Sequence, residues 1–332
     1  SACKAALDDR PEFAAALKNS TNQLRSLLLP GGGGAASSPE AVLRAALRSL
    51  PIALDAERRS LDGSRKSLSN EQVRCLAAAL QAAPPGTVLK LNLSHTPLTS
   101  AAAAALGNGA HAALAALSAL RMRGCALGDA GIVPLCAALH HPEATASSKL
   151  SELALASNNL TGGCAILIAE TVRELPQLTS LDLSYNALGA EGCAPVCDAL
   201  AEVRSLQVLS LASVGLTDTG VIGLAGRLGG VPLVEIDLDG NSASDAALGA
   251  LLGMAAQGGT LATLRLSANA VGEHGAMALA AHLVARPAGT LRSLALSNNP
   301  LTSGGGEALR AALRSNASVS ELSLTGTGAT VD

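Results

Sequence analysis

Aromatic residues are nearly missing from this chain of 332 residues, which contains one Tyr, one Phe and no Trp. Mixed protein cores and most small-molecule pockets use aromatic rings, so we expect no small-molecule substrate and no cofactor. Hydrophobic residues nevertheless make up 48% of the chain, which is enough for a core and argues against wholesale disorder. Such a core must consist of Leu, Ala, Val and Ile, and it suits small regular layers better than an irregular globule.

Charge of one sign and long apolar runs are also scarce. The net charge is −3, the isoelectric point is near 6.1, and no long charged run occurs, so nucleic acid is a poor partner. No stretch of eighteen apolar residues predicts a membrane span, and the N-terminal sequence SACKAALDDRPEF lacks the pattern of a signal peptide. The seven cysteines are odd in number and fit no zinc spacing. We therefore expect reduced thiols in a cytoplasmic protein that binds neither nucleic acid nor membrane.

The polar residues fit no catalytic or metal-binding pattern. His140 and His141 are adjacent and His274 and His282 are eight residues apart, so neither pair places two imidazoles on one face of a helical turn. The glycines at 31–34 lack the lysine and the strand context of a phosphate loop. No nucleophile can be paired with a base. We expect no enzymatic activity and no bound metal.

What the sequence does contain is a repeat. The segment LTSLDLSYNALGAEG, residues 178–192, has leucines in the pattern L-x-x-L-x-L, then an asparagine and a glycine. The pattern recurs along about four-fifths of the chain at intervals of 30, 29, 33, 28, 28, 27, 28, 30 and 28 residues. Its second leucine stands at Leu61, Leu91, Leu120, Leu153, Leu181, Leu209, Ile236, Leu264, Leu294 and Leu322.

Each unit predicts a short strand followed by a turn and a helix. The L-x-L core alternates with period two, as in a strand with one buried face, and stretches such as GIVPLCAALH have helical spacing. Three residues after the last leucine, five units have an asparagine that we expect to be buried. Its side chain can form hydrogen bonds with backbone groups of neighbouring turns. Those five are Asn158, Asn186, Asn241, Asn269 and Asn299.

Other units depart from this asparagine position. Thr96, Cys125 and Thr327 can still form hydrogen bonds there, but Val214 cannot, so we expect a looser turn in the sixth unit. The first unit, with Gly63 in place of a leucine and a lysine at the asparagine position, is atypical, as the ends of repeat arrays usually are.

The units LSELALASNNLTGGC (150–164) and LRSLALSNNPLTSGG (291–305) resemble leucine-rich repeats of the ribonuclease-inhibitor-like branch. That resemblance implies an α/β solenoid shaped like a horseshoe, with about ten repeats of 28–29 residues over residues 57–332. Parallel strands would line the concave face and helices would form the convex face.

The two ends of the chain differ from the repeats. Residues 1–56 are expected to form a helical cap, with a Gly-rich linker at 30–39, and a docking arm is the alternative. Only eight residues follow the tenth strand. We expect a partner or a further segment to cover that open strand edge.

The concave face is the expected binding surface. Most side chains between the strand leucines are Ser or Ala, and charged residues form a basic spot in repeat three and an acidic spot in repeats five and seven. Tyr and Arg are frequent binding hot spots. The candidate protein-binding residues are therefore Arg121, Arg123, Asp182, Tyr185, Glu235, Asp237, Asp239 and Arg265. A solvated face with no partner is the alternative.

These features predict a non-catalytic protein–protein interaction scaffold within a larger intracellular assembly. Relatives implied by the resemblance include inhibitors, the sensor ends of immune receptors, and parts of cytoskeletal or axonemal assemblies, so attachment to the cytoskeleton or the ciliary axoneme is one expected location. A regulator of a small GTPase is an alternative, because the Ran GTPase-activating protein is similar in repeat type and length. That family implies a strongly acidic C-terminal tail, whereas this sequence ends TGTGATVD.

Overall fold

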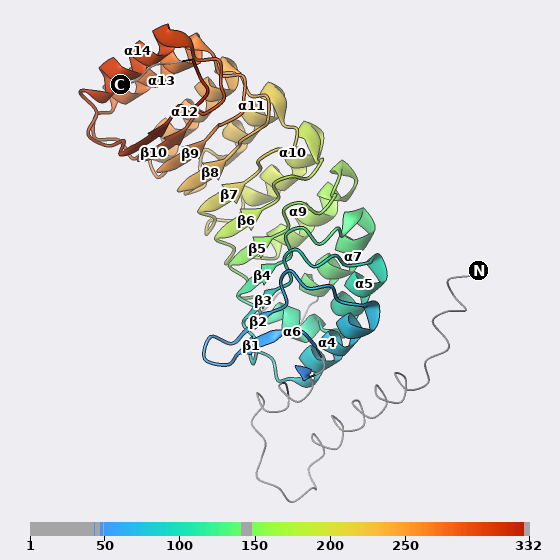
Figure 1. The fold of residues 1–332 in the computed structure, drawn as a ribbon. Helices are drawn as coiled ribbons and strands as arrows, with labels where there is room; N and C mark the ends of the chain where they lie inside the picture. Colours follow the sequence, from blue (N-terminus) through green and yellow to red (C-terminus); the bar gives the residue numbers. More distant parts are fainter. Residues whose placement is uncertain (1–42, 44–46, 49, 141–147, 329–332) are drawn as a thin grey trace, which may run out of the picture.

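A computed structural model describes residues 43, 47–48, 50–140 and 148–328 of the chain. These residues form a curved array with one open sheet on its inner side and helices on its outer side (Figure 1). The sheet has eleven strands in the order of the sequence, β1 to β11. Each repeat therefore contacts its neighbours along the chain, as expected for a solenoid.

The ten strands predicted from the leucine pattern are all present. They pair in parallel, and the second leucine of each repeat lies opposite that of the next. They are β2 (Ser60–Asp62), β3 (Lys90–Asn92), β4 (Ala119–Arg121), β5 (Glu152–Ala154), β6 (Ser180–Asp182), β7 (Val208–Ser210), β8 (Glu235–Asp237), β9 (Thr263–Arg265), β10 (Ser293–Ala295) and β11 (Glu321–Ser323). The predicted α/β solenoid with parallel strands on the concave face is confirmed.

Helices return the chain from one strand to the next on the outer side. They are α4 (Asn70–Ala82), α5 (Ser100–Gly109), α6 (His111–Ala115), α7 (Gly128–Leu139), η1 (Gly162–Cys164), α9 (Ala165–Arg173), α10 (Gly189–Leu200), α11 (Thr217–Leu228), α12 (Asp245–Gly258), α13 (Glu273–Ala285) and α14 (Thr302–Leu313). The glycine near the start of several helices allows this close stacking. A Cβ added at Gly192 would lie 2.8 Å from the Cα of Gly162 in the preceding repeat.

The N-terminal edge of the sheet is covered by a strand that the sequence does not predict. β1 (Ala53–Asp55) pairs with β2 in the antiparallel direction, within a range expected to be helical, so the prediction is wrong for these three residues. Leu43, Leu47 and Leu50 are buried against the core next to it. The Gly-rich linker and the rest of the expected cap lie outside the described residues.

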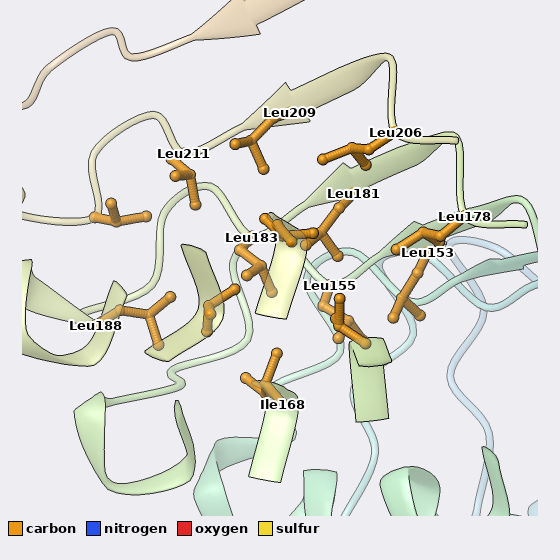
Figure 2. Close-up of a cluster of buried hydrophobic side chains, with 14 of the residues drawn as sticks. Leu153, Leu155, Ile168, Leu178, Leu181, Leu183, Leu188, Leu206, Leu209 and Leu211 are labelled. Atoms are coloured by element: carbon orange, nitrogen blue, oxygen red, sulfur yellow. The ribbon is translucent and has the colours of Figure 1, made fainter. Parts of the chain in front are cut away.

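Leucines from successive repeats fill the layer between sheet and helices. Figure 2 shows Leu153, Leu181 and Leu209, the second leucines of three repeats, pointing from neighbouring strands into this layer, with Ile168 facing them from a helix. Leu181 is 0% exposed. By contrast, Leu322 in β11 is only half-buried, since β11 has no strand on its other side in the described chain. Coverage of this edge by a partner or a further segment stays a prediction.

The asparagines join adjacent repeats where the strands end. The Oδ1 atom of Asn186 accepts hydrogen bonds from the amides of Asn158 (2.9 Å) and Leu160 (3.0 Å) in the preceding repeat. Its Nδ2 atom donates to the carbonyl of Leu155 in the preceding repeat (3.0 Å) and to that of Leu183 in its own (2.8 Å). Each of these groups is buried, so the amide replaces the water that they lose on folding.

Substitutes at the asparagine position keep part of this network. Thr96 donates its hydroxyl to the carbonyl of Gly63 at 2.7 Å, and the Sγ atom of Cys125 lies 3.0 Å from the carbonyl of Leu93. Both contacts confirm that Thr and Cys can take over the donor role of the asparagine amide.

Val214 affects a different turn from the one predicted. The turn of repeat six is held by the next asparagine, since Asn241 Oδ1 accepts from the amides of Val214 (3.1 Å) and Leu216 (3.1 Å). Because Oδ1 serves the preceding repeat, the groups left without an asparagine acceptor are the amides of Asn186 and Leu188 in repeat five. Within the described part of the chain, neither of these two amides donates a hydrogen bond. The prediction of a looser turn in repeat six is therefore wrong, and the missing acceptor concerns repeat five instead.

Truncating a central leucine tests the register of the array. We expect Leu181→Ala to lower the free energy of unfolding by about 2–5 kcal/mol, because it leaves a cavity in a fully buried layer. Urea denaturation followed by circular dichroism measures the change. A loss within about 0.5 kcal/mol, typical of surface positions, would contradict the register.

Exchanging side chains at the asparagine position tests the link between repeats. Asn186→Ala should lower the free energy of unfolding by on the order of 1–3 kcal/mol, because buried amides and carbonyls lose their partner. Val214→Asn should be tolerated or stabilising, since it offers Oδ1 to the amides of Asn186 and Leu188. The opposite ranking in the same denaturation assay would refute the role assigned to these asparagines.

Candidate functional site on the concave face

The concave face is built from the residues on either side of the buried strand leucine. Successive side chains of a strand point to opposite faces, so the first and third residues of each strand face the inner side of the curve. The parallel register places Asp182 of β6 beside Ser210 of β7, and Ser210 beside Asp237 of β8. Residues from distant parts of the sequence therefore form continuous rows across the strands.

The expected basic spot is partly neutralised. Arg121 of β4 donates to both carboxylate oxygens of Glu152 in β5, with Nη2 at 2.6 Å from Oε2. This hydrogen bonding to Glu152 raises the pKa of Arg121 above its ordinary value. Arg121 is thus already paired within the protein, and it is a weaker candidate for meeting an acidic partner than the sequence predicts.

Arg123 and Tyr185 are brought together across two repeats. The guanidinium carbon of Arg123 lies 5.7 Å from the centre of the Tyr185 ring, which is within the range of a cation–π interaction. Tyr185 is 52% exposed and has a left-handed backbone, with φ of 58°, in the turn that follows β6. The pair forms an exposed aromatic and cationic feature beside the acidic residues of β6.

The acidic spot also contains an internal ion pair. Glu235 of β8 lies 3.1 Å from Arg265 of β9, so these two candidate residues partly cancel each other. Both ion pairs on this face join diagonal neighbours, because Arg265 lies directly opposite Asp237 and Arg121 directly opposite Ala154. The sequence analysis did not identify Glu152. Its position as the first residue of β5, two residues before Ala154, places it on the concave face and could have revealed it.

Three carboxylates remain without a cationic partner among the ion pairs of the described residues. Asp182 accepts from the amide of Ser184 at 3.0 Å, and Asp237 accepts from the amide of Asp239 at 3.0 Å. Asp239 accepts from the amide of Ser267. Burial, and next the nearby charge of Asp237, raise the pKa of Asp239. These bonds orient the three side chains without an ion pair. The nearby charge of Arg265, which lies opposite Asp237, acts to lower the pKa of Asp239 but does not outweigh burial.

The side chains on the sheet surface between these carboxylates are small. Ser210 lies between Asp182 and Asp237 in the sheet, and Ala212, two residues farther along, is buried. Asp182, Asp237, Asp239 and Ser210 are called the acidic trough below. Its carboxylates can bind cationic side chains, and its floor lets the main chain of a partner approach the strands closely.

Metal-ligating side chains are scattered over the described surface. No group of three or more His, Cys, Asp or Glu residues that could hold a metal ion occurs among the described residues. None of the described helices has the length and the apolar character that crossing a membrane requires. Burial raises the pKa of the Cys193 and Cys197 thiols to about 12, so both are held in the unreactive protonated form.

Comparison with known proteins agrees with this architecture. The family model described as leucine-rich repeat matches residues 116–136, 175–197 and 290–309. The chain is 40% identical over 102 residues to "NACHT, LRR and PYD domains-containing protein 14" of Homo sapiens, and 33% identical over 145 residues to the ribonuclease inhibitor of Sus scrofa.

These alignments cover only parts of the proteins concerned. They span 30% of this chain and 9% of the first relative, and 43% of this chain and 31% of the second. Among solved structures, an internalin from Listeria monocytogenes aligns over 93% of this chain and 88% of its own, with 15% identity and a TM-score of 0.40.

The in-register leucines, the asparagine network and the two kinds of sequence match point the same way. The repeats are 27 to 33 residues long, and every described repeat before the last strand combines a strand with a helical return. The chain is a leucine-rich repeat protein of the ribonuclease-inhibitor-like kind.

Proposed function

We propose that the chain is a non-catalytic protein–protein interaction scaffold whose acidic trough binds a positively charged segment of another protein. The observation that carries this proposal is the set of carboxylates at Asp182, Asp237 and Asp239, which lack a cationic partner, whereas Arg121 and Arg265 are each matched by an acid. Uncompensated charges beside a low floor favour a ligand that supplies the opposite charge.

The kind of repeat supports binding rather than catalysis. Proteins with ribonuclease-inhibitor-like repeats are generally binding proteins, and one such relative is named an inhibitor of ribonuclease. Tyr185, stacked against Arg123 beside the trough, adds an exposed aromatic ring of the type enriched in binding hot spots. As part of the same proposal, we place the protein in the cytoplasm, where its buried thiols would stay reduced.

A second candidate is the sensor region of a larger receptor-like protein. It is favoured by the sequence match to proteins whose names state that leucine-rich repeats are joined to NACHT and PYD domains. Sequencing the complete messenger RNA tests this candidate directly. A reading frame that encodes a nucleotide-binding domain next to these repeats supports it, and a frame that lacks such a domain rules it out.

Charge reversal tests the trough. In affinity capture from a native extract, Asp237→Lys with Asp239→Lys should remove the proteins that the unchanged chain retains. With a captured protein in hand, the same change should slow association by on the order of ten-fold at low salt, because long-range attraction is lost. Rising salt should slow association to the unchanged chain, since exposed charges are screened beyond about 8 Å at physiological ionic strength.

The matched control lies on an outer helix. Glu307→Lys with Arg310→Glu changes two charges of α14 without touching the concave face, and it should leave capture unchanged. If this outer change abolishes capture while reversal of the trough does not, the binding surface is convex and the proposal is wrong. Thermal unfolding of each variant shows whether the fold is intact.

A further inference from the structure

An exposed apolar stripe runs across the convex face. One residue in each of six successive repeats stands eight positions after the asparagine position, so all six occupy equivalent places on their helices. They are Val133, Ile166, Ala194, Ile222, Gly249 and Met277. The four large members, Val133, Ile166, Ile222 and Met277, are 50%, 66%, 44% and 51% exposed. No charged residue interrupts the stripe between repeats three and eight.

A row of acids accompanies the stripe one helical turn earlier. Asp129, Asp218, Asp245 and Glu273 each stand four residues before the stripe residue of their own helix, and Glu191 stands three residues before. Residues three or four apart lie on the same face of a helix. The acidic row and the apolar stripe are therefore parallel and adjacent on the outer surface.

The acidic row is engaged only by uncharged donors. Asp129 accepts from the amide of Thr161 at 2.8 Å, Asp218 from that of Ser244 at 2.6 Å, and Asp245 from that of Gly272 at 2.6 Å. None of the five takes part in an ion pair within the described part of the chain, whereas Asp198 and Glu202, nearer the other helix ends, are paired with Arg227 and Arg173. The negative charge of the row stays uncompensated beside apolar surface.

The middle of the stripe is hollowed into a groove between α10 and α11. Its volume is about 210 Å³, and its lining is mostly apolar, with Cys193, Ala194 and Leu224. The charged residues in the lining are Glu191 and Arg227, and Arg227 is paired with Asp198. Gly220 and Gly223 also line it. The volume exceeds the roughly 150 Å³ of an apolar cavity that can hold benzene, so the groove has room for a branched aliphatic side chain.

We propose that this convex surface docks a basic amphipathic helix of a partner protein, lying across α9 to α12 with one apolar side chain in the groove. Neighbouring packed helices lie about 8–10 Å apart. A helix rises 1.5 Å per residue, so positions seven apart on one face are separated by about 10.5 Å. Apolar residues at every seventh position of the partner then meet successive members of the stripe, and lysines or arginines beside them meet the acidic row.

The charge of the acidic row favours a cationic partner helix over a second copy of the chain or an anionic membrane. Two copies of this chain placed with their convex faces together would oppose one acidic row to another. A membrane with anionic lipids would be repelled in the same way. A cationic helix satisfies both the apolar stripe and the acidic row. The proposal uses the face opposite the acidic trough and does not depend on the function proposed for the trough.

Selection from a peptide library tests the proposal. The probes are displayed 21-residue peptides with Leu, Ile, Val or Met at every seventh position and mixtures of Ala, Gln, Lys and Arg elsewhere, together with a matched library in which Glu replaces Lys and Arg. The basic library should yield peptides that bind saturably by fluorescence anisotropy, whereas the acidic library should yield none within ten-fold of their affinity.

Substitutions then locate the binding site on the protein. Ile222→Ser, in the stripe and next in sequence to the groove residue Gly223, should weaken a selected peptide at least ten-fold, and Glu191→Lys should weaken it several-fold. Val284→Ser provides the control, since Val284 is 55% exposed on α13 but lies outside the stripe, and it should change affinity less than two-fold. Asp237→Lys in the concave trough should also leave the affinity unchanged. Circular dichroism melts confirm that the variants are folded.

Several results overturn the proposal. They are the absence of saturable binding in the basic library, equal enrichment of acidic peptides, and equal loss in the stripe and control variants. Self-association that disappears in Ile222→Ser would assign the stripe to a second copy of the chain. Binding of the unchanged protein to phosphatidylserine vesicles that Ile222→Ser abolishes would assign it to a membrane.

Discussion

The amide of a buried asparagine, shared between two repeats, is the interaction on which the array depends. A three-residue strand uses few of its backbone groups in the sheet, and the chain must then turn sharply into a helix, so amides and carbonyls at the strand end would be left buried and unpaired. Asn241 shows the solution, because its Oδ1 accepts from Val214 and Leu216 while its Nδ2 donates to Leu211 at 2.7 Å. A repeat is thereby completed by the next one wherever that next repeat has the asparagine.

The two faces of the molecule follow from this construction. A fixed turn after each strand keeps the sheet in register, so the residues that flank the leucines align into rows on the concave side. The same register aligns the helices, which places equivalent helix positions in rows on the convex side. Some charged residues in these rows form ion pairs within the protein, and others do not. Arg121 and Glu235 are matched inside the protein, while the carboxylates of the acidic trough and of the convex row are not.

The repeated part of the fold could be predicted from the sequence, because every repeat must bury leucines at the same positions of its strand. The period predicted ten strands and their order, since every repeat must place its leucine beside that of its neighbour. β1 could not be predicted in this way, because it lies outside the repeat and pairs in the antiparallel direction. The effect of Val214 was assigned to the wrong repeat, because a linear pattern does not reveal that Oδ1 serves the turn before it.

The candidate site was harder to predict than the fold. The sequence placed Asp182, Asp237 and Asp239 on the concave face correctly, since alternation along a strand fixes the direction of each side chain. It did not reveal that Glu152 neutralises Arg121 or that Arg265 neutralises Glu235, because these pairs join diagonal positions on adjacent strands. It also gave no sign that Arg123 reaches the ring of Tyr185 two repeats away. Side-chain reach across neighbouring strands decides these contacts.

Hydrogen exchange at single amides tests the sharing of asparagines most directly. The amide of Leu160 donates to Asn186, whereas the next repeat has Val214 in place of the asparagine that would accept from the equivalent amide of Leu188. Both leucines stand two residues after the asparagine position of a central repeat, and only the first of the two amides has an asparagine acceptor. Native-state exchange measured by nuclear magnetic resonance should be slower at Leu160 by about ten-fold or more. The hydrogen bond at Leu160 is worth about 1 kcal/mol, and the buried amide of Leu188 carries the further cost of having no partner. Equal exchange rates at the two amides would contradict the account.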